Sequence, residues 1–374
     1  MFIKSVELKN FRNYKDQKID FDEKVNIILG NNAQGKTNII EAIYMSSMGK
    51  SFRTSKDAEL IGFGSDHAYV KVEAVKNDTD TRIEINLQSK GKNSSAKFVK
   101  KDRKDIRRTS ELINNILLVV FSPDDLKIVK EEPEKRRRFI DREACQMSPA
   151  YFDVLSNYRR ALIQRNAYLK ESRIEPDILD IWDTQLAEYG CALTEQRRAF
   201  IRKIGEYSGR IHSGITGGSE ELTVKYEPDI ELGAECETRE QKIGYFYDRI
   251  KSAFDSDMRN RTTTAGPHRD DIAFIVNGID MRSFGSQGQQ RTCALSLKLA
   301  ELDLIREEND EEGILLLDDV MSELDGSRQE YLIDTMKNNQ LFITTTDLDD
   351  SIKNKFREAA YFHVEAGTIR KIDH

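Results

Sequence analysis

The fold is decided by the stretch Gly30-Asn31-Asn32-Ala33-Gln34-Gly35-Lys36-Thr37. It follows a continuous apolar run, Val25–Leu29, which is typical of a buried strand. A helical pattern then extends from Gly35 to about Met48. A strand, a glycine-bounded loop and a helix in this order form a phosphate-binding loop (P-loop), whose pattern GxxxxGK[ST] is matched in full. The sequence therefore predicts an α/β fold in which this loop binds nucleotide phosphates.

Each part of the loop has a chemical role. The glycines allow a tight turn that points backbone N–H groups at a phosphate, and the helix that begins near Gly35 adds its N-terminal dipole. Lys36 is expected to reach the β- and γ-phosphates of ATP, and the Thr37 hydroxyl is expected to ligate Mg²⁺. All eight residues from Gly30 to Thr37 are therefore candidate cofactor-binding residues.

The second half of such a site is an acid at the end of a buried strand. The run that supplies it is Ile314-Leu315-Leu316-Leu317-Asp318-Asp319. Asp318 is expected to hold Mg²⁺, directly or through water, and Asp319 to polarise the attacking water. The sequence leaves open which acid is the base. With Lys36, these two residues are the candidate catalytic groups.

A third segment, Ser286-Gln287-Gly288-Gln289-Gln290-Arg291, opens a helix that is predicted to extend from about Gln289 to Ile305. It resembles the signature motif of ABC ATPases, whose serine and glycine N–H groups bind the γ-phosphate of the nucleotide on a partner subunit. Ser286, Gly288 and Gln289 are accordingly candidate cofactor-binding residues. The alternative is an ordinary serine N-cap.

Two further segments resemble ABC elements but depart from the usual pattern. Ser322-Glu323-Leu324-Asp325 resembles the D-loop, and Thr344-Thr345-Thr346-Asp347 follows the next strand, where ABC proteins carry a switch histidine. Because no histidine is present there, the switch role of Thr345 or Thr346 stays open. Asp124 stands where a Q-loop glutamine is expected. Asp319 replaces the usual glutamate, and this shorter carboxylate predicts slow hydrolysis.

Several stretches are similar to the RecF family along nearly the whole chain. They are Leu8-Lys9-Asn10-Phe11-Arg12-Asn13-Tyr14, Gly49-Lys50-Ser51-Phe52-Arg53-Thr54, Phe121-Ser122-Pro123-Asp124-Asp125-Leu126 and Gly266-Pro267-His268-Arg269-Asp270-Asp271. The resemblance implies a nucleotide contact for Arg12, with a surface arginine as the alternative. His268 is interpreted as a structural turn residue, and the role of Arg53 stays open.

The resemblance also implies the architecture, an α/β ABC-type ATPase head with an inserted, mainly helical lobe. The head would combine a mixed P-loop sheet with an antiparallel β part. We predict three segments: 1–122 as the N-terminal part of the head, 123–260 as the helical lobe, and 261–374 as the C-terminal part with the signature, acid motif and D-loop. The residue pattern agrees, being mostly β from 68 to 121 and helical from Pro123 to about Arg210.

The charge is unevenly distributed around a net value of −7. Lys90–Arg108 holds nine Lys/Arg and two Asp, and Lys135-Arg136-Arg137-Arg138 follows shortly after. Such tracts either bind phosphates or form solvated faces. The four separated cysteines predict free buried thiols rather than a zinc site. No apolar run is long enough for a membrane span, so a cytoplasmic location without membrane contact is expected.

The RecF resemblance implies a DNA-repair ATPase with weak, DNA-stimulated turnover. Its implied partners are duplex DNA at single-strand gaps, RecR, and functionally RecO and RecA, with ATP joining two copies of the chain. Two alternatives remain. A scaffold would use ATP only to dimerise, and an ABC transporter subunit would carry its signature much closer to the P-loop than Ser286 lies.

Overall fold

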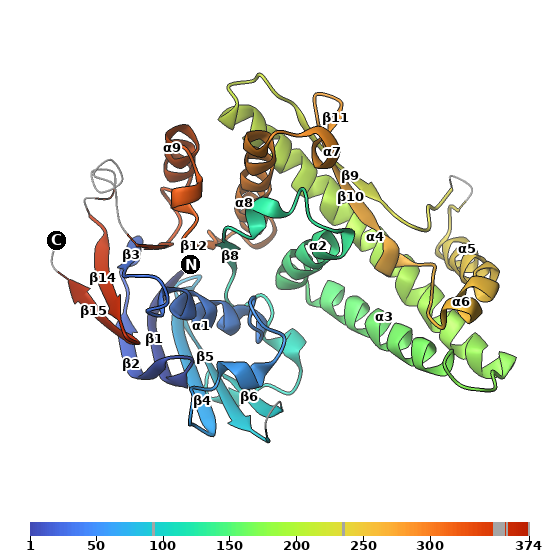
Figure 1. Cartoon of the computed structure of the whole chain (residues 1–374), viewed down its shortest axis with the longest axis horizontal. Helices are drawn as coiled ribbons and strands as arrows, with labels where there is room; N and C mark the ends of the chain where they lie inside the picture. Colours follow the sequence, from blue (N-terminus) through green and yellow to red (C-terminus); the bar gives the residue numbers. More distant parts are fainter. Residues whose placement is uncertain (92–93, 234–235, 347–355, 357, 373–374) are drawn as a thin grey trace. The chain divides into compact units, whose positions relative to one another are not determined.

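The computed structural model describes residues 1–374 except 92–93, 234–235, 347–355, 357 and 373–374 (Figure 1). The chain divides into two compact units, one formed by Met1–Leu126 with Lys298–His374 and the other by Lys127–Leu297. Within the described part of the chain, no helix is long and apolar enough to cross a membrane. The first unit is therefore built from both ends of the chain, and it contains the P-loop and the acid motif.

One sheet of the first unit is antiparallel, with strand order β2-β1-β4-β5-β6-β7. Its strands are β1 (Phe2–Phe11), β2 (Tyr14–Asp20), β4 (His67–Lys76), β5 (Thr79–Ser89), β6 (Ser95–Lys101) and β7 (Lys104–Asp105). The predicted β character of this region is thus confirmed, and β5 pairs with β6 as a hairpin requires. Lys92 and Asn93, between β5 and β6, lie outside the described residues.

The other sheet has the order β15-β14-β3-β13-β12-β8, and its strands are parallel from β14 to β8. They are β3 (Val25–Leu29), β8 (Leu118–Phe121), β12 (Ile314–Asp318), β13 (Leu341–Thr345), β14 (Ala360–Glu365) and β15 (Thr368–Ile372). Every residue of β8, β12 and β13 is buried. Continuous apolar strands of this kind are typical of a parallel sheet that is covered on both faces.

Helix α1 (Lys36–Met48) packs against strands of both sheets and is buried almost all round. Its Ile39, Ile40 and Ile43 belong to one core cluster with side chains from the two sheets. A helix that is covered on every side lies in the core and not on the surface. The P-loop at its N-terminus therefore has a rigid support. The remaining short elements of this unit are η1 (Asp57–Leu60), η2 (Thr109–Glu111), η3 (Asp125–Lys127, which crosses into the second unit), η5 (Met321–Glu323) and α9 (Gly326–Thr335).

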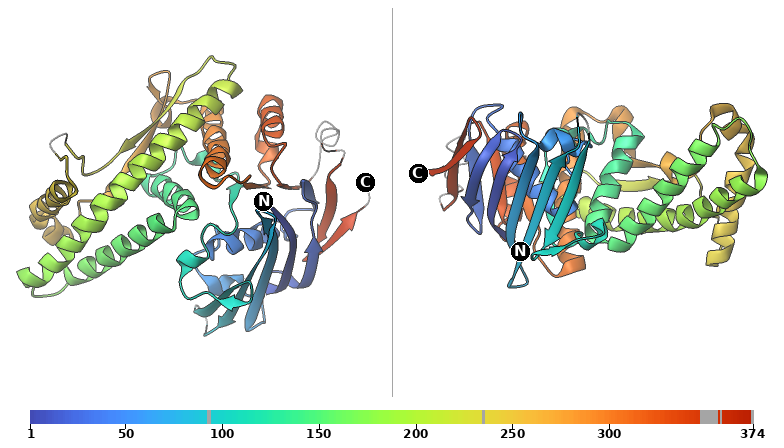
Figure 2. Two further views of the ribbon diagram at one scale, coloured as in Figure 1. Left: turned by 180° about the vertical axis from the view of Figure 1, so that it is seen from behind. Right: turned by 90° about the horizontal axis from the view of Figure 1, so that it is seen from below.

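The second unit is mainly helical. Its elements are α2 (Pro133–Met147), α3 (Pro149–Tyr168), α4 (Pro176–Ile215), α5 (Arg239–Ser252), α6 (Phe254–Asn260), η4 (Pro267–Arg269), α7 (Met281–Phe284) and the start of α8 (Gln287–Asn309). Figure 2 shows the long helices α3 and α4 side by side. Proline occupies the first turn of α2, α3 and α4, where its missing N–H costs no intrahelical hydrogen bond.

A three-stranded antiparallel sheet completes the second unit, in the order β11-β10-β9. Its strands are β9 (Leu222–Glu227), β10 (Asp271–Val276) and β11 (Ile279–Asp280). Strand β9 packs on α4, and β10 packs on α2. The predicted boundary at 260/261 therefore does not coincide with the observed division at Leu297/Lys298, because β10 and β11 pack in the helical unit. The predicted buried thiols are confirmed at Cys145, Cys191, Cys236 and Cys293.

Candidate nucleotide site

The P-loop connects β3 to α1, and its glycines occupy positions that other residues could not. A Cβ atom at Gly30 would collide with the carbonyl oxygen of Val364. Gly35 has a φ of 121°, and a Cβ atom there would lie 2.7 Å from the Asn13 side chain. Gly35 is the N-cap of α1, and no side chain of the described residues caps this helix. The loop and the first turn of α1 thus offer backbone N–H groups to an anion, as a phosphate requires.

The β1–β2 hairpin supports the P-loop from one side. Nδ2 of Asn13 donates to the carbonyl oxygen of Gln34 at 2.7 Å. Oδ1 of Asn13 accepts from Nδ2 of Asn38 at 2.8 Å. The hydroxyl of the buried Tyr14 donates to the carbonyl oxygen of Gly35 at 3.1 Å. These contacts fix two consecutive peptide units of the loop, so its conformation is held from outside.

The turn between β14 and β15, near the other end of the chain, also supports Gln34 of the P-loop. The N–H of Ala366 donates to Oε1 of Gln34 at 2.6 Å. The N–H of Gly367 donates to the carbonyl oxygen of Gln34 at 3.1 Å. A Cβ atom at Gly367 would collide with the carbonyl oxygen of Asn13. We call Asn13, Gln34, Ala366 and Gly367 the loop brace. No local sequence pattern predicts the loop brace, because its members are distant along the chain.

Lys36 is only 3% exposed, and its ammonium is folded back over the loop. Nζ donates to the carbonyl oxygen of Gly30 at 2.8 Å and lies 3.4 Å from that of Asn31. It also lies 3.7 Å from Oδ2 of Asp319. The structure therefore brings the predicted P-loop lysine and the second predicted acid together, with the cation held where loop phosphates would bind.

Asp318 is the point at which the two halves of the predicted site meet. Oγ1 of Thr37 donates to Oδ1 of Asp318 at 2.9 Å, and Oγ1 of Thr344 donates to the same oxygen at 2.9 Å. Asp318 and Thr344 are paired in the register of β12 and β13. Burial raises the pKa of Asp318, and the hydroxyls of Thr37 and Thr344 oppose this rise. A hydroxyl and a carboxylate so placed supply the hard oxygen ligands that Mg²⁺ prefers.

Asp319 has an uncommon backbone conformation for a residue with a side chain, with a φ of 53°. Its N–H donates to the hydroxyl of Thr344 at 3.0 Å and to the carbonyl oxygen of Thr344 at 3.2 Å. Burial raises the pKa of Asp319, whereas the Lys36 ammonium opposes this rise. The left-handed turn directs the carboxylate toward Lys36, and strain of this kind is concentrated at functional sites.

Arg12 makes close contacts within the protein. Its Nε and Nη2 donate to the two carboxylate oxygens of the fully buried Glu41 at 2.9 and 2.7 Å, and Nη1 donates to the carbonyl oxygen of Glu59 at 2.9 Å. Arg53 lies 3.5 Å from the same carboxylate and donates to Oδ1 of Asn38 at 2.9 Å. Asn38 lies in the first turn of α1, and the charge of Arg53 lowers the pKa of Asp318. Arg53 is therefore nearer to the acid motif than the sequence suggested.

The predicted signature segment begins α8 with a reciprocal cap. The N–H of Gln289 donates to Oγ of Ser286 at 3.2 Å, and the N–H of Ser286 donates to Oε1 of Gln289 at 3.1 Å. This is a capping box, so the N-cap alternative describes the observed contacts. Gly288 is half-buried in the same turn. Nε2 of Gln289 also donates to Glu220 at 2.8 Å, which orients the segment further.

The structure describes the whole D-loop segment and the first three residues of the switch segment. Asp325 caps α9, because its side chain accepts from the N–H of Arg328 at 3.0 Å. Thr344 contacts both acids of the acid motif, whereas the sequence pointed to Thr345 or Thr346 as the switch position. Asp347 lies outside the described residues. The role of Thr344 depends on its register opposite Asp318 in a parallel sheet, which no local sequence pattern indicates.

The residues of the basic tract Lys135-Arg136-Arg137-Arg138 lie in different environments. Arg136 is 1% exposed and forms a two-bond ion pair with Asp271, at 2.7 and 2.6 Å. Lys135 pairs with Glu131 at 2.8 Å, and Arg138 pairs with Glu134 at 3.0 Å. The interpretation of all four as one exposed charge run is therefore wrong for Arg136, because its position on α2 faces the core of the unit.

Comparisons with other proteins agree on a single family. The family model described as RecF/RecN/SMC N terminal domain matches residues 2–369. A curated protein from Agathobacter rectalis, named DNA replication and repair protein RecF, is 46% identical over 376 residues and covers 100% of both chains. A protein of the same name from Acetivibrio thermocellus is 43% identical, with 98% of this chain and 99% of that one covered.

Solved structures give the same result. One is described as the recombination mediator protein RecF-ATP in the RecFOR pathway; it is 36% identical, has a TM-score of 0.90 and covers 100% of this chain and 98% of that one. An Smc head bound to the C-winged helix domain of ScpA is 17% identical, with a TM-score of 0.55, and shows the shared fold alone. The predicted ABC-type head with a helical lobe is confirmed. This chain belongs to the RecF family of DNA replication and repair proteins.

Proposed function

We propose that this chain is an ATP-dependent DNA-binding protein of recombinational repair and replication restart, with slow ATP hydrolysis. The observation that carries the proposal is the meeting of Lys36 and Thr37 with Asp318 and Asp319. These groups come from opposite ends of the sequence, and Thr37 and Asp318 are 281 residues apart. Such convergence is required of a nucleotide site and is not explained by a plain glycine turn.

The residues present fit ATP and Mg²⁺. Lys36 would bind the β- and γ-phosphates of ATP. The N–H groups at the start of α1 would donate to oxygens of the same phosphate chain. Thr37 and Asp318 would hold Mg²⁺, which neutralises charge on the phosphates when it is bound. No group of three or more His, Cys, Asp or Glu suited to a metal occurs among the described residues.

Asp319 is the residue best placed to polarise water. Its carboxylate lies at the mouth of the site beside Lys36 and is 37% exposed. The short side chain reaches less far than a glutamate would. The shorter reach predicts slow turnover, so that ATP binding rather than hydrolysis sets the state of the protein. Lys36 contributes mainly by stabilising charge on the phosphates.

Two copies of the chain would complete the active site. The signature segment of one copy, with Ser286, Gly288 and Gln289, would bind the γ-phosphate held by the P-loop of the other. The capping box between Ser286 and Gln289 supports this, because it fixes the turn and leaves the Ser286 hydroxyl able to donate to a phosphate. ATP would then join the two copies, and hydrolysis would separate them.

DNA and the recombination proteins are the proposed partners. The relatives are named DNA replication and repair proteins, and a similar solved structure is described as part of the RecFOR pathway. We infer binding to duplex DNA at single-strand gaps, cooperation with RecR and RecO, and assistance to RecA loading. Lysine and arginine contacts to phosphates would give binding without sequence preference.

ATP turnover measured against protein concentration, with and without gapped duplex DNA, tests this proposal. Specific activity that rises with concentration and with DNA supports a two-copy site coupled to DNA. Nucleotide binding with no turnover at any concentration would favour a scaffold instead. Lys36→Met serves as the control, because it should abolish the signal without touching the second unit.

A further inference from the structure

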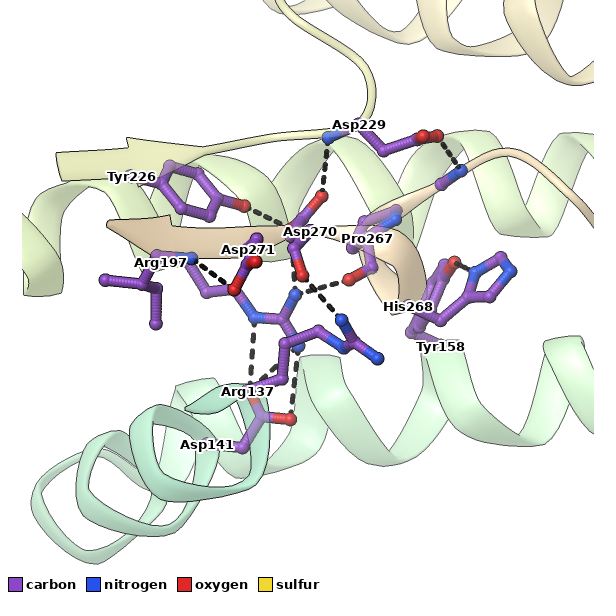
Figure 3. Close-up of polar contacts among 12 residues, drawn as sticks. Arg137, Asp141, Tyr158, Arg197, Tyr226, Asp229, Pro267, His268, Asp270 and Asp271 are labelled. Atoms are coloured by element: carbon purple, nitrogen blue, oxygen red, sulfur yellow. Dashed lines mark hydrogen bonds and ion pairs between the residues drawn. The ribbon is translucent and has the colours of Figure 1, made fainter. Parts of the chain in front are cut away.

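The stretch Gly266–Asp271, one of the segments similar to the RecF family, lies in a buried polar network (Figure 3). Arg197 is its centre. The guanidinium donates to Asp141 at 2.9 and 3.1 Å, to Asp270 at 2.8 Å and to the carbonyl oxygen of Pro267 at 2.6 Å. These bonds join α2, α4 and the loop before β10, so the stretch is held from several elements.

The remaining residues of the stretch are fixed as well. The N–H of Gly266 donates to Asp229 at 2.8 Å, and the N–H of Asp229 donates to Asp270 at 2.9 Å. Nε2 of His268 lies 3.0 Å from the carbonyl oxygen of Thr263, which can only accept, so Nδ1 of His268 accepts from the Tyr158 hydroxyl at 2.7 Å. His268 is therefore a structural residue, as the sequence predicted.

Arg269 is the exception in this stretch. It is exposed, and among the described residues no hydrogen bond or ion pair involves its side chain. Arg137 of α2 lies close by: its Nη1 donates to the carbonyl oxygen of Asp270 at 2.6 Å, and no carboxylate of the described residues pairs with it. Arg137 and Arg269 both lower the pKa of His268, so both positive charges act on the imidazole of that residue. Lys135 and Arg138, by contrast, are neutralised by glutamates one helical turn away.

We propose that Arg137 and Arg269 form a phosphate-binding site for the backbone of duplex DNA, and that the buried network serves to present them rigidly. The proposal rests on the proposed DNA-binding function. Each guanidinium offers a planar set of N–H donors that matches phosphate oxygens. Because the peptide units on both sides of Arg269 are already bonded within the protein, little backbone freedom is lost on binding. Contacts of this kind carry no base information, so the site would be independent of DNA sequence.

The test measures binding of gapped duplex DNA over a range of salt concentrations, with a non-hydrolysable ATP analogue and Mg²⁺ present. Arg269→Gln should weaken binding about five- to tenfold and reduce the slope of log K against log salt by about one. Arg137→Gln should act in the same direction. Arg269→Lys keeps the charge and should keep the slope. Nucleotide affinity and melting temperature should not change for Arg269→Gln, because the residue is exposed.

Arg173→Gln is the charge-matched control. Arg173 is exposed and precedes α4, about 30 Å along that helix from Arg197. If Arg173→Gln weakens binding as much as Arg269→Gln, the effect is general electrostatics and the site does not exist. The same conclusion follows if Arg269→Gln binds DNA like wild type, in which case an acidic protein surface becomes the candidate partner. If wild type itself fails to bind DNA, the proposed function fails first.

Discussion

Thr37 and Asp318 are joined by a hydrogen bond of 2.9 Å between their side-chain oxygens, across 281 residues of sequence. Thr344 donates to the same oxygen of Asp318, which leaves the other carboxylate oxygen for a cation. The hydroxyl of Thr37 and the carboxylate of Asp318 thus lie together at the start of α1, where they would serve as the proposed oxygen ligands of Mg²⁺. The nucleotide chemistry proposed for this chain depends on that pair.

Asp318→Asn should separate Mg²⁺ binding from nucleotide binding. An amide oxygen can still accept from Thr37, so the local structure should persist, but the charge that attracts Mg²⁺ is lost. We expect the tightening of ATP-analogue binding by Mg²⁺ to fall about 10- to 100-fold. Isothermal titration calorimetry with and without Mg²⁺ measures this directly. Equal Mg²⁺ dependence in the variant and wild type would remove Asp318 from the metal site.

The same substitution should stabilise the nucleotide-free protein at neutral pH. A carboxyl group whose folded-state pKa is raised stabilises the fold below its unfolded pKa, and that contribution is lost as the pH rises through the folded-state pKa. Burial raises the pKa of Asp318 in this way. Asp318→Asn should therefore raise Tm by about 1–3 °C at neutral pH. The gain should shrink as the pH falls toward the raised pKa, and a gain that grew on acidification would contradict this explanation.

The loop brace predicts that residues outside the P-loop set nucleotide affinity. Asn13→Ala removes the bonds to Gln34 and Asn38, and we expect ATP-analogue affinity to fall about five- to tenfold. Gln17→Ala is the matched control, since Gln17 accepts from the N–H of Ile369 in β15 but does not contact the loop. Both variants should lower Tm slightly. If affinity falls equally in both, the brace acts through general stability alone.

Arg136 and Arg138 on α2 should differ sharply in their effect on stability. Arg136→Gln removes the two-bond partner of the largely buried Asp271, which keeps only its longer ion pair with Arg282 at 3.7 Å, at a cost of about 2–3 kcal/mol. Arg138→Gln breaks an exposed pair with Glu134, at a cost below about 0.5 kcal/mol. Urea unfolding of both variants measures the difference. Equal losses would show that Arg136 is no more a core residue than Arg138.

The sequence predicted the parts of the site that are contiguous along the chain. The P-loop and the acid motif each combine a buried strand with a polar end, and such patterns identify the elements and predict a chemistry for them. The loop brace and the role of Thr344 could not be predicted, because they depend on strand register and on turns distant in sequence. The buried position of Arg136 had an available signal: Phe139, Ile140 and Glu143 share its helical face and are also buried.

The domain division shows a different kind of limit. Helical and β patterns located the elements near residues 260–297, but not the unit with which they pack. Strand β10 belongs to the helical unit because it pairs with β9 and because Asp271 binds Arg136. Tertiary contacts of this kind decide where a compact unit ends, whereas local propensity decides only what the elements are.

The most direct test of the account is the oligomeric state in solution with and without ATP. Sedimentation velocity would compare wild type with Ser286→Arg and Ser252→Arg, two exposed serines of the second unit. We predict an ATP-dependent dimer for wild type and Ser252→Arg, and a monomer for Ser286→Arg that still binds ATP with unchanged affinity. A Ser286→Arg protein that dimerises normally with ATP would contradict the two-copy site.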